Sequence, residues 1–243
     1  MKATVLLPAG KQEPLAALPI IAGGPTTLGD RIYGVLEEAI ITGALQPGQR
    51  LRAEELAKHF GISRIPIRET LRALDANGWI DLRPRHGAYV RNRTDQELAD
   101  LFHVRLILEG EASLWAAERR TDEQLREMEA LVKEGRKAAA RSDRDGVGRI
   151  NTDFHRLVAA STHNAVLAQL LDGLSKRVRF YFSTVASDRG KTSVEEHAKL
   201  VRAIRGRDGE GAVRITRAHI TMTQAAVQKT MKSPAPDHSD ARS

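Results

Sequence analysis

The sequence predicts a mainly α protein in two parts. The first is a compact unit of helix, tight turn, helix and small hairpin, and the second is an all-helical antiparallel bundle. Three observations lead to this prediction. Apolar residues recur at helical spacing through most of the chain. Strand-like alternation is confined to a short segment before residue 91. Three Ser/Thr-x-x-Glu/Gln patterns, typical of helix starts, stand out after residue 93.

The composition narrows the classes of protein. The 243 residues suffice for two modest domains, and fractions of 41% hydrophobic and 28% charged residues are those of ordinary globular proteins. Cysteine is absent, which excludes disulfides, thiolate metal sites and cysteine nucleophiles. Aromatic residues make up 4%, which argues against a base-stacking sheet that binds single strands. The net charge of +7 is compatible with a polyanionic partner.

The two ends differ from the rest of the chain. Residues 1–27 and 232–243 mix Pro, Gly and polar residues or short apolar pieces without a sustained period, so we expect two flexible arms. The apolar run near the start is too short for a secretory signal, and no later stretch approaches the length of a membrane span. We therefore expect a cytoplasmic protein without a membrane partner.

The first unit is expected over residues 28–93. Apolar spacing predicts a helix over residues 30–42, which ends before a Gln-Pro-Gly turn. A short helix over residues 53–60 is followed by Gly61, which suits a left-handed bend, and by Ser63, which suits the cap of the next helix. The result is a helix-turn-helix at about residues 53–72.

A longer helix and a hairpin complete this unit. The helix runs to Asn77, and Pro66 is tolerated because it falls in the first turn. After it, "WIDL" and "AYV" alternate apolar and polar residues around "RPRHG", which predicts a two-stranded hairpin. A hairpin in this place forms a wing beside the helix-turn-helix.

The long helix carries a stripe of arginines. Arg64, Arg68 and Arg72 lie one turn apart, while Ile67 and Leu71 lie on the adjacent stripe. The helix therefore packs inward and presents guanidinium groups outward. Guanidinium groups contact both guanine edges and phosphates, and a helix N-terminus offers amides to a phosphate backbone. This face suits duplex DNA.

The wing adds positive charge at its tip. Arg83, Arg85 and His86 lie there, where a hairpin would enter a neighbouring groove. A solvated arginine face on a packed helix is the alternative interpretation of the stripe alone. The series of short helix, glycine turn, basic helix and basic hairpin favours DNA, because groove docking needs these elements in this order.

The second unit is expected over residues 94–231, with roughly six helices. Three possible capping boxes support it: Thr94 with Glu97, Thr121 with Gln124, and Ser193 with Glu196. Apolar residues at helical spacing lie between them. No internal repeat of solenoid length is present.

Five of the eight histidines fall in the second unit: His103, His155, His163, His197 and His219. Asn151 and His155 lie four apart and share a helix face, while His197 and His219 lie on separate expected helices. Three imidazoles with an oxygen ligand would hold a divalent ion such as zinc. From spacing alone, ordinary core or surface histidines remain the alternative.

The first unit resembles the winged helix-turn-helix domain of GntR-type bacterial transcription regulators. The matching segments are "GALQPGQRL", "ELAKHFGISRIPIRETLRALDANGWI" and "RHGAYV", in order. The resemblance implies a recognition helix that starts at Ser63. It implies that the following residues contact the operator, the last two of them in the minor groove: Ser63, Arg64, Ile65, Pro66, Arg68, His86 and Gly87.

The second unit resembles the FCD ligand-sensing domain of the FadR branch of these regulators, through "RLILEGEAS", "NTDFHRL", "EEHAKLVRAI" and "AHI". The resemblance implies a divalent metal, zinc or similar, and a small carboxylate effector. Its implied metal ligands are Asn151, where many members carry Asp, and His155, His197 and His219. Arg105 matches a position suited to bind the carboxylate, although an intrahelical pair with Glu109 fits its spacing equally well.

Together these observations predict a metabolite-responsive transcription regulator rather than an enzyme. We expect a homodimer on a near-palindromic operator of double-stranded DNA, with repression as the more natural sign. Two alternatives remain open at this point. One is a metal-dependent hydrolase or lyase with a DNA-binding module, although no local motif marks a Glu or Asp as its base. The other is a DNA-binding protein without an effector.

Overall fold

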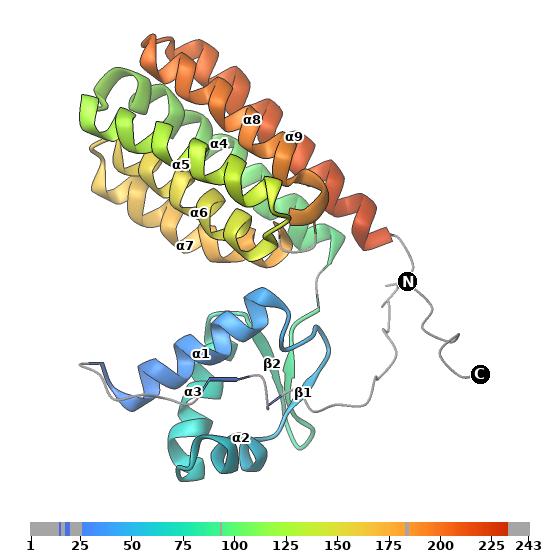
Figure 1. Ribbon diagram of the computed structural model, residues 1–243. Coiled ribbons are helices and arrows are strands. Elements are labelled where there is room, and N and C mark those ends of the chain that lie inside the picture. The colour runs from blue at the N-terminus through green and yellow to red at the C-terminus, as the bar shows by residue number, and fades with distance from the viewer. Residues whose placement is uncertain (1–14, 16–17, 20–25, 93, 183–184, 233–243) are drawn as a thin grey trace. The chain divides into compact units, whose positions relative to one another are not determined.

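A computed structural model describes residues 15, 18, 19, 26–92, 94–182 and 185–232, without the side chains of residues 186–188. The chain divides into two compact units between residues 93 and 94. Figure 1 shows the first unit as short helices with a small sheet and the second as long helices only. The mainly α fold class predicted from the sequence is confirmed.

The first unit contains three helices and three strands within the described residues. They are α1 (Leu28–Thr42), β1 (Arg50–Leu51), α2 (Ala53–Phe60), α3 (Arg64–Ala76), β2 (Ile80–Arg83) and β3 (Gly87–Val90). Thr27 caps α1 by accepting a hydrogen bond from the amide of Asp30, and Gly43 ends it in the left-handed conformation. The predicted helix boundaries are therefore close to those observed.

The sheet of the first unit has the strand order β1-β3-β2 and is antiparallel throughout. The predicted two-stranded hairpin is present as β2 and β3, and its observed register places Leu82 opposite Ala88. The structure adds β1, a third strand beside the hairpin that the sequence did not predict. Arg50 of β1 pairs with Tyr89. Two residues are too few to show strand alternation, and β1 exists only because β3 offers it an edge.

The core of the first unit lies between the helices and the sheet. Ile67 and Leu74 on α3 are fully buried, as are Ile32 and Leu36 on α1. Leu18, in the segment expected to be an arm, is also buried, and its carbonyl oxygen lies 3.2 Å from His59 Nε2. The apolar stripe of α3 thus faces inward, which leaves its arginine stripe outside.

The second unit consists, within the described residues, of six helices. They are α4 (Asp95–Arg119), α5 (Asp122–Ala140), α6 (Arg144–Ala160), α7 (Ala165–Phe182), α8 (Ala186–Arg205) and α9 (Gly209–Lys232). Several connections are only a few residues long, which makes successive helices antiparallel. α4 packs along α9, as Figure 1 shows, and Met128, Phe154 and Ile204 lie in the buried core.

One expected helix start is wrong. Thr94 and Thr121 are N-caps, and Thr121 forms a full capping box with Gln124. Ser193, however, lies inside α8, which begins seven residues earlier at Ala186. Ser193 is almost fully buried, and its hydroxyl donates to Asn151 Oδ1 at 3.4 Å. The Ser-x-x-Glu pattern is common within helices, so it does not identify a helix start by itself.

None of the described helices combines the length and apolarity needed to cross a membrane.

Candidate DNA-binding face and buried histidine centre

The turn between α2 and α3 has the geometry expected of a helix-turn-helix. Gly61 adopts φ +66° and ends α2 by donating its amide to Ala57 and Lys58 carbonyls. Ser63 is the N-cap residue of α3 in extended conformation, but its side chain makes no capping hydrogen bond. The exposed hydroxyl of Ser63 is therefore available at a helix N-terminus, where anions bind.

The predicted arginine stripe of α3 is exposed. Arg68 and Arg72 lie on the surface, and Arg64 donates to Glu54 of α2 at 2.6 Å in an exposed ion pair. Ile65, one residue into the helix, is 68% exposed, which is unusual for a large apolar side chain. An apolar contact to a thymine methyl group would use such a residue.

The wing tip is shaped by its glycine and by Tyr89. Arg85 adopts φ +64° and Gly87 φ +106° at the turn of the hairpin. A Cβ at Gly87 would lie 3.3 Å from Arg50 Nε, so a side chain there would crowd the arginine. The guanidinium of Arg83 lies over the Tyr89 ring, 4.6 Å from its centroid. Sequence reasoning did not assign Arg50 or Tyr89 a role in the wing.

Three of the histidines from the second unit lie together in its interior, although they come from three helices. His155 is on α6, His197 on α8 and His219 on α9, and one ring nitrogen of each lies within 4.8 Å of the others. His197 stacks on Phe154 with a centroid distance of 4.2 Å. His103 is exposed on α4 and His163 lies in the turn before α7, so neither joins this histidine centre.

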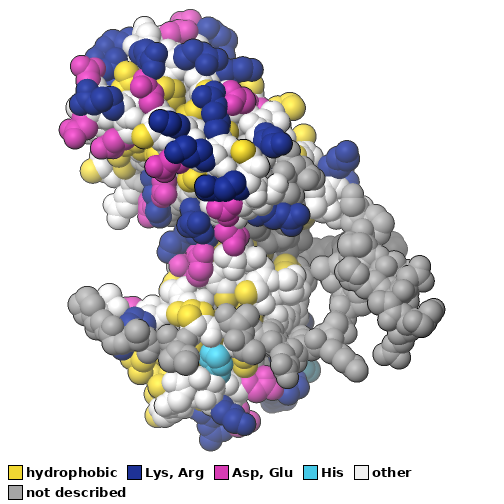
Figure 2. All heavy atoms as spheres, viewed as in Figure 1, with side chains coloured by type: hydrophobic (Ala, Val, Ile, Leu, Met, Phe, Trp, Pro, Cys, Tyr) yellow, Lys and Arg dark blue, Asp and Glu magenta, His cyan; other side chains and the backbone are white. Residues whose placement is uncertain are grey.

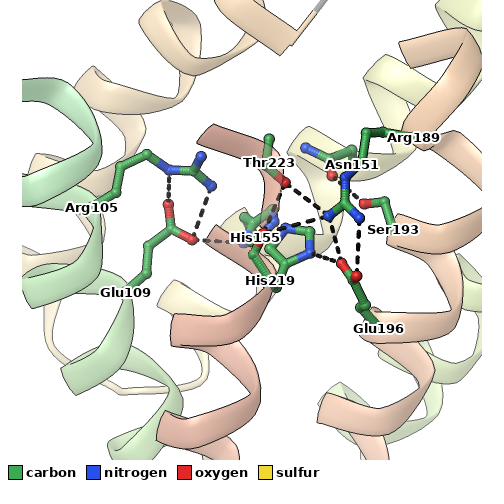
Figure 3. Close-up of polar contacts among 9 residues, drawn as sticks. All are labelled: Arg105, Glu109, Asn151, His155, Arg189, Ser193, Glu196, His219 and Thr223. Carbon is green, nitrogen blue, oxygen red and sulfur yellow. Dashed lines mark hydrogen bonds and ion pairs between the residues drawn. The ribbon is translucent and has the colours of Figure 1, made fainter. Parts of the chain in front are cut away.

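The first ion pair at the centre comes from α4. Arg105 Nε donates to Glu109 Oε1 at 2.7 Å, and the other oxygen of Glu109 lies 3.0 Å from His155 Nδ1 (Figure 3). Arg105 is 1% exposed. Burial would raise the pKa of the Glu109 carboxyl, but attraction to Arg105 and His155 and hydrogen bonds from both hold that pKa well below its usual range. The intrahelical pair considered as an alternative for Arg105 is thus present.

A second ion pair faces the first across the histidines. Arg189 donates through both terminal nitrogens to Glu196, and Glu196 Oε2 lies 2.8 Å from His219 Nδ1. Arg189 also donates to Thr223 Oγ1 at 3.0 Å, as Figure 3 shows. Burial opposes ionisation of Glu196, but hydrogen bonds from His219 and Arg189 lower its pKa to about 2.

These carboxylates set the tautomer of two histidines. A carboxylate only accepts hydrogen bonds, so the Nδ1 atoms of His155 and His219 carry the proton and their Nε2 atoms keep a lone pair. Among the described residues, the buried Nε2 atoms of His155 and His197 have no hydrogen-bond partner. Buried nitrogen lone pairs that receive no hydrogen bond can instead bind a cation.

The three histidines fit a divalent metal. Metal–nitrogen bonds of about 2.1 Å allow two ligand nitrogens to lie up to about 4.2 Å apart. The observed limit of 4.8 Å is slightly larger, so small side-chain rotations would bring all three onto one ion. Carboxylates on the far nitrogens are the usual second partners of metal-bound histidines.

A cavity opens beside the centre. It encloses about 540 Å³, counting its open part, and Arg105, Glu109, Asn151, His155 and Thr216 contribute to its wall. The remaining wall includes apolar side chains such as Leu171, Val178 and Leu200. Arg105 Nη1 and Thr216 Oγ1 are buried donors without a partner among the described residues. The cavity therefore offers polar recognition at one side and apolar contact at the other.

Several residues of the centre were not selected from the sequence. Glu196, Arg189 and Thr216 were missed as site residues, and Glu109 was considered only as a partner of Arg105. Arg189 and Glu196 lie seven apart on one helix face, which is a signal of proximity, but such pairs are common on exposed helices. Only burial beside histidines distinguishes this pair, and burial of charge is not visible in the sequence.

The centre makes stability depend on pH in the metal-free protein. Burial lowers the pKa of His219 to about 4, even though the hydrogen bond to Glu196 raises it, and burial also lowers the pKa of His197. The unfolded chain therefore takes up these protons first, so folding stability falls as pH decreases from about 6.5 towards 4. For His219 alone the loss between pH 7 and pH 4 is about 3 kcal/mol.

Denaturant unfolding of chelator-treated protein at pH 7 and pH 4 checks this prediction. His219→Gln should reduce the loss by about that amount, because the variant has no imidazole to protonate. His103→Gln removes an exposed histidine from the same unit and is the matched control. An unchanged pH dependence in His219→Gln would contradict the assigned burial effect.

The surface of the second unit that Figure 2 shows carries both acidic and basic side chains. The two kinds are interspersed over it. Exposed pairs such as Arg136 with Glu195 and Arg205 with Glu129 contribute to this mixture. Such a surface suits solubility more than it suits binding to a polyanion.

Comparison with known proteins agrees with this architecture. Residues 28–90 match the description "Bacterial regulatory proteins, gntR family", and residues 100–222 match the FCD domain. The galactonate operon transcriptional repressor of Escherichia coli (strain K12) is 31% identical over 223 residues, which cover 82% of this chain and 95% of that protein. The HTH-type transcriptional regulator LutR of Bacillus subtilis (strain 168) is 30% identical over 209 residues, covering 75% and 93%.

A solved structure shares the fold. Escherichia coli McbR/YncC superposes with a TM-score of 0.73 at 21% identity, covering 85% of this chain and 99% of that one. The winged helix-turn-helix, the six-helix unit with its histidine centre and the matches over both units lead to one conclusion. This chain belongs to the GntR family of bacterial transcription regulators, as a DNA-binding regulator with an FCD ligand-sensing domain.

Proposed function

We propose that this regulator is a repressor that binds a near-palindromic operator as a homodimer and responds to a small carboxylate bound beside a metal ion in the second unit. The observation that carries the proposal is the histidine centre, where three imidazoles lie beside a cavity whose wall includes an arginine donor without a partner in the described part of the chain. Relatives that are named repressors support repression rather than activation. The cytoplasm is the compartment in which such a protein meets DNA.

The DNA contacts proposed for the first unit follow its exposed surface. On α3 and its N-cap these are Ser63, Arg64, Ile65, Pro66, Arg68 and Arg72, of which only Pro66 is half-buried, and on the wing Arg85, His86 and Gly87. The arginines supply hydrogen bonds to guanine edges or phosphates, and Ile65 supplies apolar contact in the major groove. Arg64 would have to break its ion pair with Glu54 to reach the DNA, so its net contribution to the free energy of DNA binding is smaller than that of Arg68.

A homodimer follows from the small size of one module. A single recognition helix reaches few base pairs, whereas two modules joined by their second units multiply affinity and set the half-site spacing. An effector that binds one arrangement of the dimer better than another shifts the population between them. By linkage, DNA and effector then change each other's affinity by the same factor.

The metal ligands proposed are His155, His197 and His219, with the side-chain oxygen of Asn151 as a fourth. When bound, the ion would act as a Lewis acid that coordinates the effector carboxylate. Arg105 would donate to the same carboxylate through its unpartnered Nη1. The galactonate named in one relative is itself a carboxylate, which is consistent with this chemical class.

The two carboxylates that bind the histidines do not favour hydrolysis. An enzyme of that kind needs a general base with a pKa near the working pH. The pKa values of Glu109 and Glu196 both lie well below that range because each carboxylate is held by an arginine. Carboxylates in this state serve to orient histidines and are weak bases.

His155→Ala tests the metal part of the proposal. Purified wild-type protein should contain close to one divalent ion per chain by elemental analysis, and His155→Ala should contain about tenfold less, because losing one of three imidazoles weakens the site strongly. His103→Ala is the matched control. In a thermal-shift screen, a carboxylic acid that binds should raise the unfolding temperature of the wild-type protein but not that of chelator-treated protein. Equal metal content in wild type and His155→Ala would refute the ligand set.

A further inference from the structure

The charged groups around the histidine centre balance one another. Among the described residues, the charged side chains that line the cavity or bind the histidines form three ion pairs: Arg105 with Glu109, Arg156 with Asp172, and Arg189 with Glu196. The two pairs that bind histidines are largely buried, whereas Arg156 and Asp172 are about half exposed. Each carboxylate is therefore already neutralised by a guanidinium, and the local sum of charges is zero.

The proposed metal ligands add no charge to this balance. Imidazole is neutral when it binds a metal, and the side chain of Asn151 is a neutral amide. Asn151 is 7% exposed, lines the cavity together with His155, and accepts a hydrogen bond from Ser193. A divalent ion held only by these groups would leave two uncompensated positive charges in a place where His197 and His219 are each 4% exposed.

Uncompensated charge is costly in such surroundings. An ion taken out of bulk water loses favourable solvation, and polar groups or an opposite charge must replace it. Water in the open cavity would recover part of this loss, but an anion beside the ion recovers more because attraction is stronger at low dielectric. Arg105 also favours a bound anion, since its Nη1 has no hydrogen-bond partner among the described residues and a carboxylate would accept from it.

We propose that the effector supplies the negative charge that the protein ligands of the metal lack, so that metal and anionic effector bind this regulator cooperatively and Asn151 sets the strength of their coupling. The inference rests on the proposed metal site and adds a property to it. The regulator then responds to the two ligands jointly, because each ligand strengthens the binding of the other. Because coupling is reciprocal, the effector raises metal affinity by the same factor as the metal raises effector affinity.

A metal titration of the full chain without DNA tests the inference. Metal-stripped protein is titrated with zinc against a competing fluorescent indicator, at fixed pH and ionic strength, in the presence of acetate or of acetamide. Acetate is a small carboxylate that binds zinc weakly in water, and acetamide has nearly the same shape without the charge. A titration without protein corrects for zinc bound by acetate.

Wild type should bind zinc about tenfold more tightly or better in acetate than in acetamide, since coupling between two ligands is commonly 5–150-fold. Asn151→Asp places a negative charge in the centre without a change of volume. This variant should bind zinc more tightly than wild type in acetamide and gain less than about threefold from acetate. Asn164→Asp, which adds the same charge outside the cavity wall, should behave like wild type.

Equal zinc affinity of wild type in acetate and acetamide would overturn the inference while leaving the metal site in place. An equal gain from acetate in wild type and Asn151→Asp would remove Asn151 from the coupling. Zinc binding by neither protein would refute the proposed metal site, and the inference with it. Thermal unfolding of each metal-free variant, together with binding to operator DNA, identifies any variant that fails to fold.

Discussion

Replacing Arg68 by alanine is expected to weaken binding of the proposed dimer to its operator by about 2–6 kcal/mol, since a good bidentate contact to a base contributes about 1–3 kcal/mol and a dimer would make two. Arg68 is exposed at the second turn of α3, clear of the buried face that carries Ile67 and Leu71. The folding stability of the variant should therefore stay close to that of wild type. Gel shifts or anisotropy titrations with operator DNA at a stated salt concentration measure the loss.

Arg126→Ala is the matched control for Arg68→Ala. It removes an exposed arginine of α5, in the second unit, so it changes the net charge equally. A loss of affinity shared by both variants would show a general effect of charge rather than a specific contact. Undiminished operator binding by Arg68→Ala would contradict the proposed DNA-binding face.

Replacing Arg105 by methionine is expected to destabilise the second unit by about 3–5 kcal/mol, because removing one partner of a buried pair leaves the other charge unpaired. The charge left behind is Glu109, whose other partner is His155. The same variant should lose its thermal shift with carboxylates, because it lacks the proposed donor. Denaturant unfolding with and without effector measures both effects.

A double variant separates the two roles of Arg105. In Arg105→Met with Glu109→Gln, no charge is left unpaired, and the amide oxygen of glutamine still accepts from His155 Nδ1. The double variant should regain most of the folding stability that Arg105→Met loses. It should still show no thermal shift with carboxylates. A double variant that regains its effector response would show that Arg105 is a structural partner of Glu109 and not an effector ligand.

The helices were accessible to sequence reasoning because their signals are local. Helix α2 ends at the glycine that follows Phe60, and α3 begins directly after Ser63, as the sequence indicates. Apolar spacing also indicates which face of α3 is buried, since a helix repeats its faces every 3.6 residues. The family assignment followed from motifs of the same local kind, and the comparisons confirm it.

The elements that sequence reasoning missed depend on distant partners. β1 is a strand only because β3 lies beside it, and Ser193 is buried inside α8 although its local pattern resembles a helix start. The strand order β1-β3-β2 likewise reflects packing of segments that are far apart in the chain. Local patterns cannot distinguish these outcomes, because the deciding contacts are non-local.

The sequence alone determined that this protein is a GntR-type regulator with a winged helix-turn-helix and a helical FCD domain, because those features are carried by periodicity, turns and ordered motifs. It also drew attention to Asn151 and to the histidines of α6, α8 and α9. Only the tertiary structure decided that three of them meet, that Glu109 and Glu196 orient two of them, and that arginines neutralise both carboxylates. The charge balance of this buried centre depends on side chains from four helices, α4, α6, α8 and α9, so no single segment of the sequence reveals it.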